Sequence, residues 1–249
     1  MTWTITDVQS AFDKAQPTYD TTATIQYQAA NQLVDYLPLL NPSSIIDLGC
    51  GTGFVTDALL TKYKESSYHL IDLSDQMIAG CQQKYADLDS ITFATANMDH
   101  YAYSKTDLII SNLAVQWSKD LRALLSTLAS KASTVAFTTL THGTFQEWED
   151  LLRINGISSP LLPLPSTQDL SQLCHNLNQD SQIISKDYQL TFPTISAFIL
   201  YLRNLGATTG KGIQDKAKFK TLIQSHKEPL TVTYKVLFCI MGKKYKPIS

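Results

Sequence analysis

Apolar runs alternate with amphipathic stretches over the first 140 residues, and this alternation predicts strands and helices in turn. Apolar residues recur at helical spacing over residues 21–37, and the short apolar run Ser44–Leu48 ends in glycines, as a buried strand does. The same pattern predicts helices over residues 54–63, 75–86 and 120–130, and strands over residues 68–71, 91–94, 107–111 and 134–139. Strands separated by helices indicate right-handed crossovers and therefore a doubly wound, parallel α/β sheet.

The rest of the chain has a less regular pattern. Residues 156–166 carry three prolines and are expected to form a loop. The predicted elements that follow are helices over residues 167–177, 193–205 and 215–224, a strand over residues 182–192, and a glycine-rich break over residues 206–212. Residues 230–241 alternate and are rich in β-branched side chains, which predicts a late strand that joins the edge of the sheet.

A glycine-rich turn follows the first predicted strand, in the sequence Asp47-Leu48-Gly49-Cys50-Gly51-Thr52-Gly53. Glycines let the backbone approach a ligand closely, and a doubly wound sheet binds nucleotide-like ligands at the carboxyl end of this strand. A dinucleotide fingerprint needs a glycine at position 54, where Phe54 stands. The carboxylate of Asp47 also suits a cationic ammonium and would repel a pyrophosphate. The turn therefore disfavours a nicotinamide-dependent oxidoreductase.

Polar residues also end the next two strands. Asp72 ends the second strand, 21 positions after Gly51, where a carboxylate can accept both hydroxyls of a ribose. Asn97 and Met98 follow the third strand, where a polar side chain or the backbone can read an adenine edge. Either acid alone could be an ordinary strand-end residue. An ammonium-binding acid, a ribose-binding acid and an adenine-reading group together predict the cofactor S-adenosylmethionine.

Residues 40–140 resemble the class I S-adenosylmethionine-dependent methyltransferases. This resemblance implies a Rossmann-like, seven-stranded and mostly parallel sheet with an antiparallel last strand. Longer strings resemble one family within that class over almost the full length, the malonyl-acyl-carrier-protein O-methyltransferases of biotin synthesis. The strings that carry this likeness are Asn112–Trp117 (NLAVQW), Val135–Leu140 (VAFTTL), Leu205–Thr208 (LGAT) and Ala11–Ala15 (AFDKA), the last followed by Tyr19.

The family resemblance implies a domain plan and a reaction. Residues 1–249 are expected to form a single methyltransferase domain, divided into an N-terminal helical lid (1–38), a cofactor-binding core (39–155), a helical substrate-lid insertion over the active site (156–228), and a final strand and tail (229–249). The implied reaction transfers a methyl group to the free carboxylate of malonyl-acyl carrier protein. A methyltransferase for a free small carboxylic acid would have the same body, and a silent domain that only senses the cofactor also stays open.

The resemblance and the strand-end positions together nominate site residues. The expected cofactor contacts are Asp47, Gly49, Cys50, Gly51, Gly53, Asp72, Leu73, Met77, Asn97, Met98 and Asn112. The expected positioning residues are Tyr19, Gln116 and Trp117, and the expected substrate contacts are Tyr19, Trp117, His142 and Arg203. A malonyl carboxylate is ionised near pH 7, so no general base and no metal are expected. Simpler roles stay open: core packing for Trp117, a helix cap for Gln116, packing for Tyr19, and polar surface roles for His142 and Arg203.

The charge of the chain is unevenly distributed. The net charge is −2, from 20 basic and 22 acidic side chains, but residues 1–200 hold 10 basic against 20 acidic residues and residues 201–249 hold 10 against 2. A basic end on an acidic body predicts an anionic partner. The resemblance implies that this partner is the acidic carrier protein, docked on Lys211, Lys216, Lys218, Lys220 and Lys227. Solvated lysines that serve only solubility are the alternative, and the absence of a nucleic-acid-binding motif argues against nucleic acid.

Composition narrows the remaining classes. At 44% hydrophobic and 17% charged residues, the chain can fill a core. No apolar run reaches the roughly 18–20 residues that span a bilayer, and the first residues have no basic and apolar signal-peptide pattern. The four cysteines, Cys50, Cys81, Cys174 and Cys239, form no C-x-x-C pair, which argues against a zinc site and a disulfide framework. We expect a soluble, cytoplasmic monomer without membrane contact.

Overall fold

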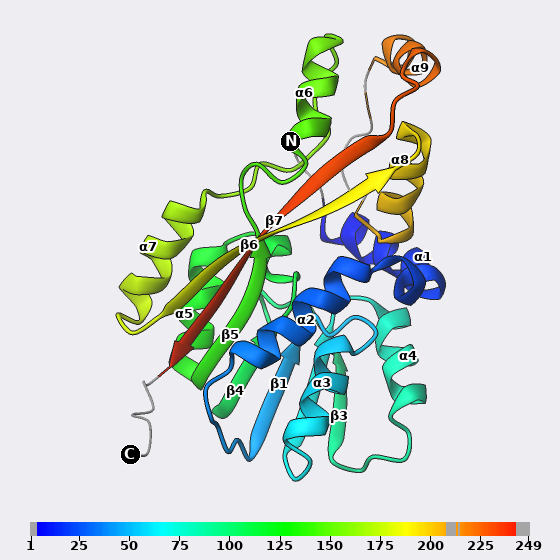
Figure 1. Ribbon diagram of the computed structural model, residues 1–249. Coiled ribbons are helices and arrows are strands. Elements are labelled where there is room, and N and C mark those ends of the chain that lie inside the picture. The colour runs from blue at the N-terminus through cyan, green and yellow to red at the C-terminus, as the bar shows by residue number, and fades with distance from the viewer. Residues whose placement is uncertain (1–3, 208–212, 214, 243–249) are drawn as a thin grey trace.

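The computed structural model describes residues 4–207, 213 and 215–242, which fold around one seven-stranded sheet with helices on both faces (Figure 1). The strands are β1 (Ser44–Leu48), β2 (Ser67–Asp72), β3 (Ile91–Thr95), β4 (Thr106–Ser111), β5 (Ala132–Leu140), β6 (Gln182–Phe192) and β7 (Leu230–Gly242). The helices are α1 (Ile5–Thr22), α2 (Thr24–Tyr36), α3 (Phe54–Lys62), α4 (Asp75–Lys84), α5 (Leu121–Lys131), α6 (Gln146–Ile154), α7 (Thr167–Leu177), α8 (Ile195–Asn204) and α9 (Lys216–Ser225), with the short 3₁₀ turn η1 (Val115–Trp117).

The strand order is β3-β2-β1-β4-β5-β7-β6, and β1 to β5 pair in parallel. β7 is antiparallel to both of its neighbours, so β6 runs in the same direction as β5. The expected Rossmann-like α/β sheet with an antiparallel last strand is confirmed. The prediction that this last strand joins the edge is wrong, because β7 inserts between β5 and β6, and β6 forms the edge.

Two layers of helices bury the two faces of the sheet. α2, α3 and α4 contribute Leu33, Leu59 and Ile78 to one core cluster, while α5 and α7 contribute Leu125 and Leu170 to the other. The β3–β4 connection has no helix, and its residues Tyr101 and Tyr103 pack ring to ring at 5.1 Å against the second cluster. Aromatic side chains therefore fill the place of a crossover helix on that face.

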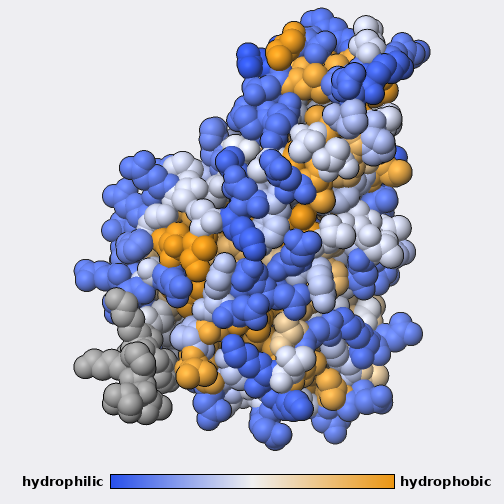
Figure 2. Space-filling model, in the orientation of Figure 1, coloured by the Kyte–Doolittle hydropathy of each residue, from blue (hydrophilic) through white to orange (hydrophobic). Residues whose placement is uncertain are grey.

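The β6–β7 pair extends past the end of β5. Residues 230–235 of β7 pair with β6 alone, whereas Val236 is the first residue of β7 that also pairs with β5. Figure 1 shows this two-stranded projection with α6, α8 and α9 around it, and Figure 2 shows a narrow upper part with apolar surface among polar residues. The projection rises from the carboxyl end of β5, the sheet edge at which the glycine turn after β1 also lies.

Most element predictions are confirmed within a few residues. The predicted helix over 21–37 begins at Thr24, because a break at Ala23 separates it from α1, which continues through Pro17. The prolines of 156–166 lie in a loop as predicted, whereas α6 was not predicted. The segment 156–228 supplies β6 to the sheet and α7 to its face. Among the described residues, no helix is long and apolar enough to cross a membrane.

Candidate active site

The turn between β1 and α3 requires glycine. Gly49, Gly51 and Gly53 have φ angles of +69°, +54° and +89°, a region that favours residues without a Cβ. A Cβ placed on Gly49 would lie 2.3 Å from the Cβ of Ala114, and one on Gly53 would lie 2.2 Å from the hydroxyl oxygen of Tyr85. The turn therefore brings bare backbone against two neighbouring segments and leaves no room for side chains at these two positions.

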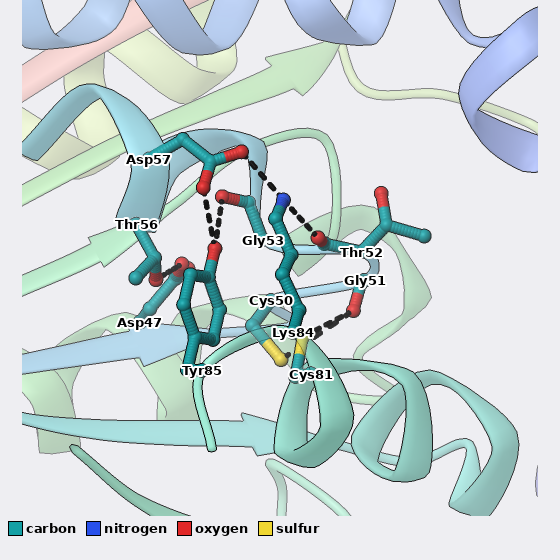
Figure 3. Close-up of polar contacts among 10 residues, drawn as sticks. All are labelled: Asp47, Cys50, Gly51, Thr52, Gly53, Thr56, Asp57, Cys81, Lys84 and Tyr85. Atoms are coloured by element: carbon teal, nitrogen blue, oxygen red, sulfur yellow. Dashed lines mark hydrogen bonds and ion pairs between the residues drawn. The ribbon is translucent and has the colours of Figure 1, made fainter. Parts of the chain in front are cut away.

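The end of α4 holds this turn in place (Figure 3). The Tyr85 hydroxyl lies 2.8 Å from a carboxylate oxygen of Asp57 and 3.0 Å from the carbonyl oxygen of Gly53. The Lys84 ammonium donates to the Thr52 carbonyl at 3.0 Å and pairs with Asp57 at 2.5 Å. Because Asp57 lies in the first turn of α3, these contacts tie both flanking helices to the glycine turn.

Asp47 is a buried acid with half of its hydrogen-bonding capacity unused. The Thr56 hydroxyl donates to its Oδ2 at 2.7 Å, and its Oδ1 has no hydrogen-bond partner among the described residues. The side chain is fully buried, and burial raises the pKa of Asp47 to about 7 from its ordinary value of 3.8. A buried carboxylate with a free oxygen is suited to a cation, which would restore the lost interaction.

Asp72 faces the same region from the end of β2. Its two carboxylate oxygens accept backbone N–H groups, from Gly51 at 2.9 Å and from Ser74 at 2.8 Å. Burial raises the pKa of Asp72, and the backbone hydrogen bonds oppose that rise. An ionised carboxylate has about four lone-pair sites, so Asp72 can still accept hydroxyl groups of a ligand.

A cavity opens in front of this turn, and eight of the eleven expected cofactor contacts line it: Gly49, Gly51, Asp72, Leu73, Met77, Asn97, Met98 and Asn112. The other three, Asp47, Cys50 and Gly53, do not line it. Asp47 is buried, the buried Cys50 thiol points toward the Gly51 carbonyl oxygen at 3.8 Å, and Gly53 caps α3. Four further residues line the cavity and were not predicted as contacts: Ile5 and Val8 of α1, and Leu113 and Ala114 after β4.

Helix α1 supplies one wall of this cavity. The Phe12 ring meets Trp117 edge to face with centroids 5.8 Å apart, and Tyr19 stacks on Phe54 at 6.1 Å. Phe12 and Tyr19 both line the cavity, and the Thr18 hydroxyl of the same helix donates to the Asn204 carbonyl of α8 at 3.3 Å. Helix α1 therefore packs on η1 and α3 and contacts α8, and its aromatic rings form part of the cavity wall.

A second cavity shares Trp117 with the first, because this residue lines both. Gln116 lines the second cavity, and its amide is fixed by hydrogen bonds to the Leu113 carbonyl at 2.6 Å and from the Thr139 hydroxyl at 3.3 Å. Gln116 thus ties the end of β4 to β5 and caps no helix. Two ligands, one in each cavity, would meet at Trp117.

Comparison with known proteins agrees with this geometry. Residues 45–132 match the family described as "Methyltransferase domain". The malonyl-[acyl-carrier protein] O-methyltransferase of Neorickettsia risticii is 23% identical over 245 residues, which cover 96% of each chain. The protein with the same name from Priestia megaterium is 29% identical over 222 residues, which cover 81% of each chain. Residues 45–132 form a methyltransferase domain, and the chain is an S-adenosylmethionine-dependent methyltransferase.

Solved structures support the fold of this methyltransferase. The YcgJ protein of Bacillus subtilis superimposes with a TM-score of 0.63 at 11% identity, and the match covers 88% of the present chain and 99% of YcgJ. At that identity the comparison supports the fold alone. The cofactor is S-adenosylmethionine, and the cavity offers it the side-chain-free glycine turn and the accepting carboxylate of Asp72, while Asp47 lies buried behind the turn.

The other expected substrate contacts of the methyltransferase lie apart from one another. His142 is exposed at the wall of the second cavity, where its backbone N–H donates to the Pro165 carbonyl at 2.9 Å. Arg203 is exposed on α8 and lines neither cavity. The structure therefore brings His142, but not Arg203, to the place where Gln116 and Trp117 lie.

The expected docking lysines are exposed on and beside α9. Lys216, Lys218 and Lys220 belong to this helix, and Lys227 follows it. Lys218 pairs with Asp215 at 3.3 Å and donates to the Gly156 carbonyl, also at 3.3 Å, next to the end of α6. Lys211 lies outside the described residues. Over residues 4–207, 213 and 215–242, no cluster of His, Cys, Asp or Glu could hold a metal ion.

Proposed function

We propose that this methyltransferase moves the methyl group of S-adenosylmethionine to the free carboxylate of malonyl-acyl carrier protein, forming a methyl ester for biotin synthesis. The relatives that carry this name align over most of the chain. The observation that carries the proposal is the shared wall at Trp117, which joins a cavity of cofactor-binding character to a second, largely apolar cavity. An acceptor carboxylate held beside Trp117 would face the methyl donor.

Residues of the first cavity would hold the cofactor, which supplies a methyl group on a positively charged sulfur. Asp47 would balance the ammonium, and Asp72 would accept the ribose hydroxyls. Asn97 and the Met98 backbone would read the adenine edge. The glycine turn, with Gly49, Cys50, Gly51 and Gly53, would let the backbone approach the ligand, while Leu73, Met77 and Asn112 complete the wall.

The acceptor needs placement and not activation. A malonyl carboxylate is ionised near neutral pH, so no residue has to remove a proton. Attack on the methyl group neutralises opposite charges, and such a step gains from alignment and from exclusion of water. Tyr19 and Trp117 line the first cavity, and Gln116 is fixed at the start of the second. These three residues and α1 would align the acceptor with the methyl group and keep water out. His142 would contact the acceptor from the far wall, and Arg203 would be an outer contact.

The carrier protein would dock on α9. Carrier proteins are acidic, and Lys216, Lys218, Lys220 and Lys227 place positive charge on and beside α9. Lys211, which lies outside the described residues, belongs to the same proposed docking set. In this arrangement residues 1–38 act as the cofactor lid, residues 39–155 as the core, residues 156–228 as the substrate side and residues 229–249 as the closing strand and tail. We place the protein in the cytoplasm as a monomer that binds neither membrane nor nucleic acid.

Mass spectrometry of the intact carrier protein tests this function. The methyltransferase is incubated with S-adenosylmethionine and either malonyl-carrier protein or acetyl-carrier protein, which lacks the free carboxylate. We expect the mass of the malonyl form alone to rise by one methyl group in place of a proton. If folded protein that binds S-adenosylmethionine in calorimetry leaves both masses unchanged, the proposed substrate is wrong.

A further inference from the structure

The walls of the second cavity are unusual in their charge. They come from η1, from the end of β5 and the segment after it, from α6, and from the proline-rich loop, with Ala207 as one further lining residue. The lining residues are Gln116, Trp117, Leu140, His142, Gly143, Thr144, Phe145, Glu149, Pro160, Leu161, Leu162, Pro163, Leu164 and Ala207. Among these described residues there is no lysine or arginine, and Glu149 is the one acid. A ligand group in this cavity meets mostly apolar walls, the polar residues Gln116, His142 and Thr144, and one carboxylate among the described lining residues.

Glu149 is fixed in this wall by the loop itself. The Ser159 hydroxyl donates to its Oε1 at 2.9 Å, and the Leu161 N–H donates to the Ser159 oxygen at 3.2 Å. α6 anchors the residue from the other side, because the adjacent Trp148 is buried and packs edge to face on Phe198. Among the described residues Glu149 forms no salt bridge, and the nearby Arg153 of the same helix pairs with Asp150 instead.

We infer that the second cavity receives the uncharged, thioester-linked arm of the acceptor, and that Glu149 excludes free dicarboxylic acids. This inference rests on the proposed function and names the selectivity of its site. A malonyl thioester carries one carboxylate, which stays near Trp117, and its neutral arm can occupy the apolar cavity. A free diacid would place its second carboxylate there, beside the Glu149 carboxylate and with no lysine or arginine among the described lining residues, which costs more in a partly desolvated cavity than in water.

A charge series at position 149 tests the inference. Glu149→Gln keeps an acceptor for Ser159 and removes the charge, and Glu149→Lys reverses it. The control is Asp150→Asn at the next position, where the acid pairs with the exposed Arg153 at 2.9 Å and does not line the cavity. The readout is the inhibition constant of free glutarate in the methylation of S-malonyl-N-acetylcysteamine, a thioester with a short neutral arm, and thermal unfolding checks that each variant is folded.

We expect Glu149→Gln to lower the inhibition constant of glutarate about tenfold, which corresponds to about 1.4 kcal/mol, and Glu149→Lys to lower it further. Asp150→Asn should leave it unchanged. An inhibition constant that stays the same in the folded Glu149→Gln and Glu149→Lys variants overturns the inference while leaving the proposed function intact. A wild-type enzyme that methylates glutarate and no malonyl thioester overturns the proposed function instead.

Discussion

The two cavities that meet at Trp117 are built in different ways. The first is formed at the carboxyl ends of β1, β2, β3 and β4, with α1 above it, and it contains the carboxylate of Asp72 and the bare backbone of the glycine turn. The second is formed by η1, by the end of β5 and the connection after it, by α6 and by the proline-rich loop, and its walls are largely apolar. The walls of the first cavity are mainly residues at the strand ends, whereas the walls of the second are mainly residues of the connecting segments.

This difference indicates which properties each cavity can control. The register of parallel strands fixes where strand-end residues lie, so the first cavity can hold a charged, hydroxyl-rich ligand in one position. Connections can change in length and composition without disturbing the sheet, so the second cavity is the place where acceptor selectivity can reside. Perturbing each cavity separately should therefore separate cofactor binding from acceptor choice.

The largest expected effect comes from adding one methyl group to the glycine turn. Gly49→Ala would place a Cβ 2.3 Å from that of Ala114 at a positive φ, so we expect the free energy of unfolding to fall by about 2–3 kcal/mol and cofactor affinity to fall with it. Urea denaturation and calorimetry with S-adenosylmethionine measure the two effects. Such a result would show that the first cavity depends on the exact shape of the turn.

Gly80→Ala is the matched control for this variant. Gly80 lies within α4, and an added Cβ would approach only the flexible amide end of Gln16, at 3.0 Å. Because alanine is favoured over glycine inside a helix by about 1 kcal/mol, we expect unchanged or higher stability. If the two variants are equally stable, the claim that the turn accepts only glycine at position 49 is wrong.

A smaller, pH-dependent effect is expected at Asp47. Burial raises the pKa of Asp47 to about 7 in the cofactor-free protein, so the folded state holds this proton more tightly than the unfolded state does. The contribution of Asp47 to stability is therefore fully present below about pH 4 and is lost as the pH rises to about 7. Asp47→Asn should remove this loss and give a higher free energy of unfolding at pH 8 than the wild type.

The same variant should weaken cofactor binding. We expect the affinity of Asp47→Asn for S-adenosylmethionine at pH 8 to be about tenfold lower, since a charge-assisted contact to the ammonium is replaced by a neutral one. Wild-type affinity should decline as the pH falls below 7, and the exposed Asp89→Asn control should follow the wild type. Calorimetry across pH measures these affinities. If Asp47→Asn binds S-adenosylmethionine at pH 8 as tightly as the wild type does, Asp47 does not contact the cofactor.

The smallest expected effect concerns the projection and leaves both cavities untouched. Reversing Lys216, Lys218 and Lys220 to Glu should raise the KM for malonyl-carrier protein about fivefold at low salt, because exposed charges mainly steer encounter. The KM for S-malonyl-N-acetylcysteamine should not change. Steady-state kinetics at several salt concentrations provide the measurement, and the difference between substrates should shrink as salt rises.

Three lysines near the opposite edge of the sheet serve as the control for this reversal. Lys64, Lys105 and Lys131 precede strands β2, β4 and β5, at the amino ends of the parallel strands and away from the projection. Their reversal changes the net charge equally. If both triple variants raise the KM for the carrier protein to the same extent, a general charge effect explains the result and docking on α9 is contradicted.

The sequence predicted site residues best where a distinctive residue type stands at the end of a predicted strand. The glycine turn and Asp72 could be read from spacing, because a positive φ limits the choice of residue and a strand end limits its place. For Asp47, the sequence indicated an acid at the strand end but not its burial. That burial depends on how α3 and Thr56 pack behind the turn. The wall contributed by Ile5 and Val8 depends on how α1 lies across the sheet.

The second cavity was less accessible to sequence reasoning. Leu140, Glu149 and the loop over 160–164 lie far apart in the chain and meet only because α6 and the loop pack together. The signal for α6 was present, with acids in its first turn, Arg153 in its last, and apolar residues at helical spacing. The place of β7 could not be read in the same way, because its alternation fits an edge strand as well as an inner strand, and the neighbour β6 decides between them.

A crystal structure with S-adenosylhomocysteine and a non-reactive malonyl-pantetheine thioether tests the central claim most directly. We predict that the nucleoside occupies the first cavity with its ribose at Asp72, that the pantetheine arm occupies the second cavity beside Glu149, and that the malonyl carboxylate lies next to Trp117. An arm that reaches the first cavity by another route, with the second cavity left empty, would contradict the account.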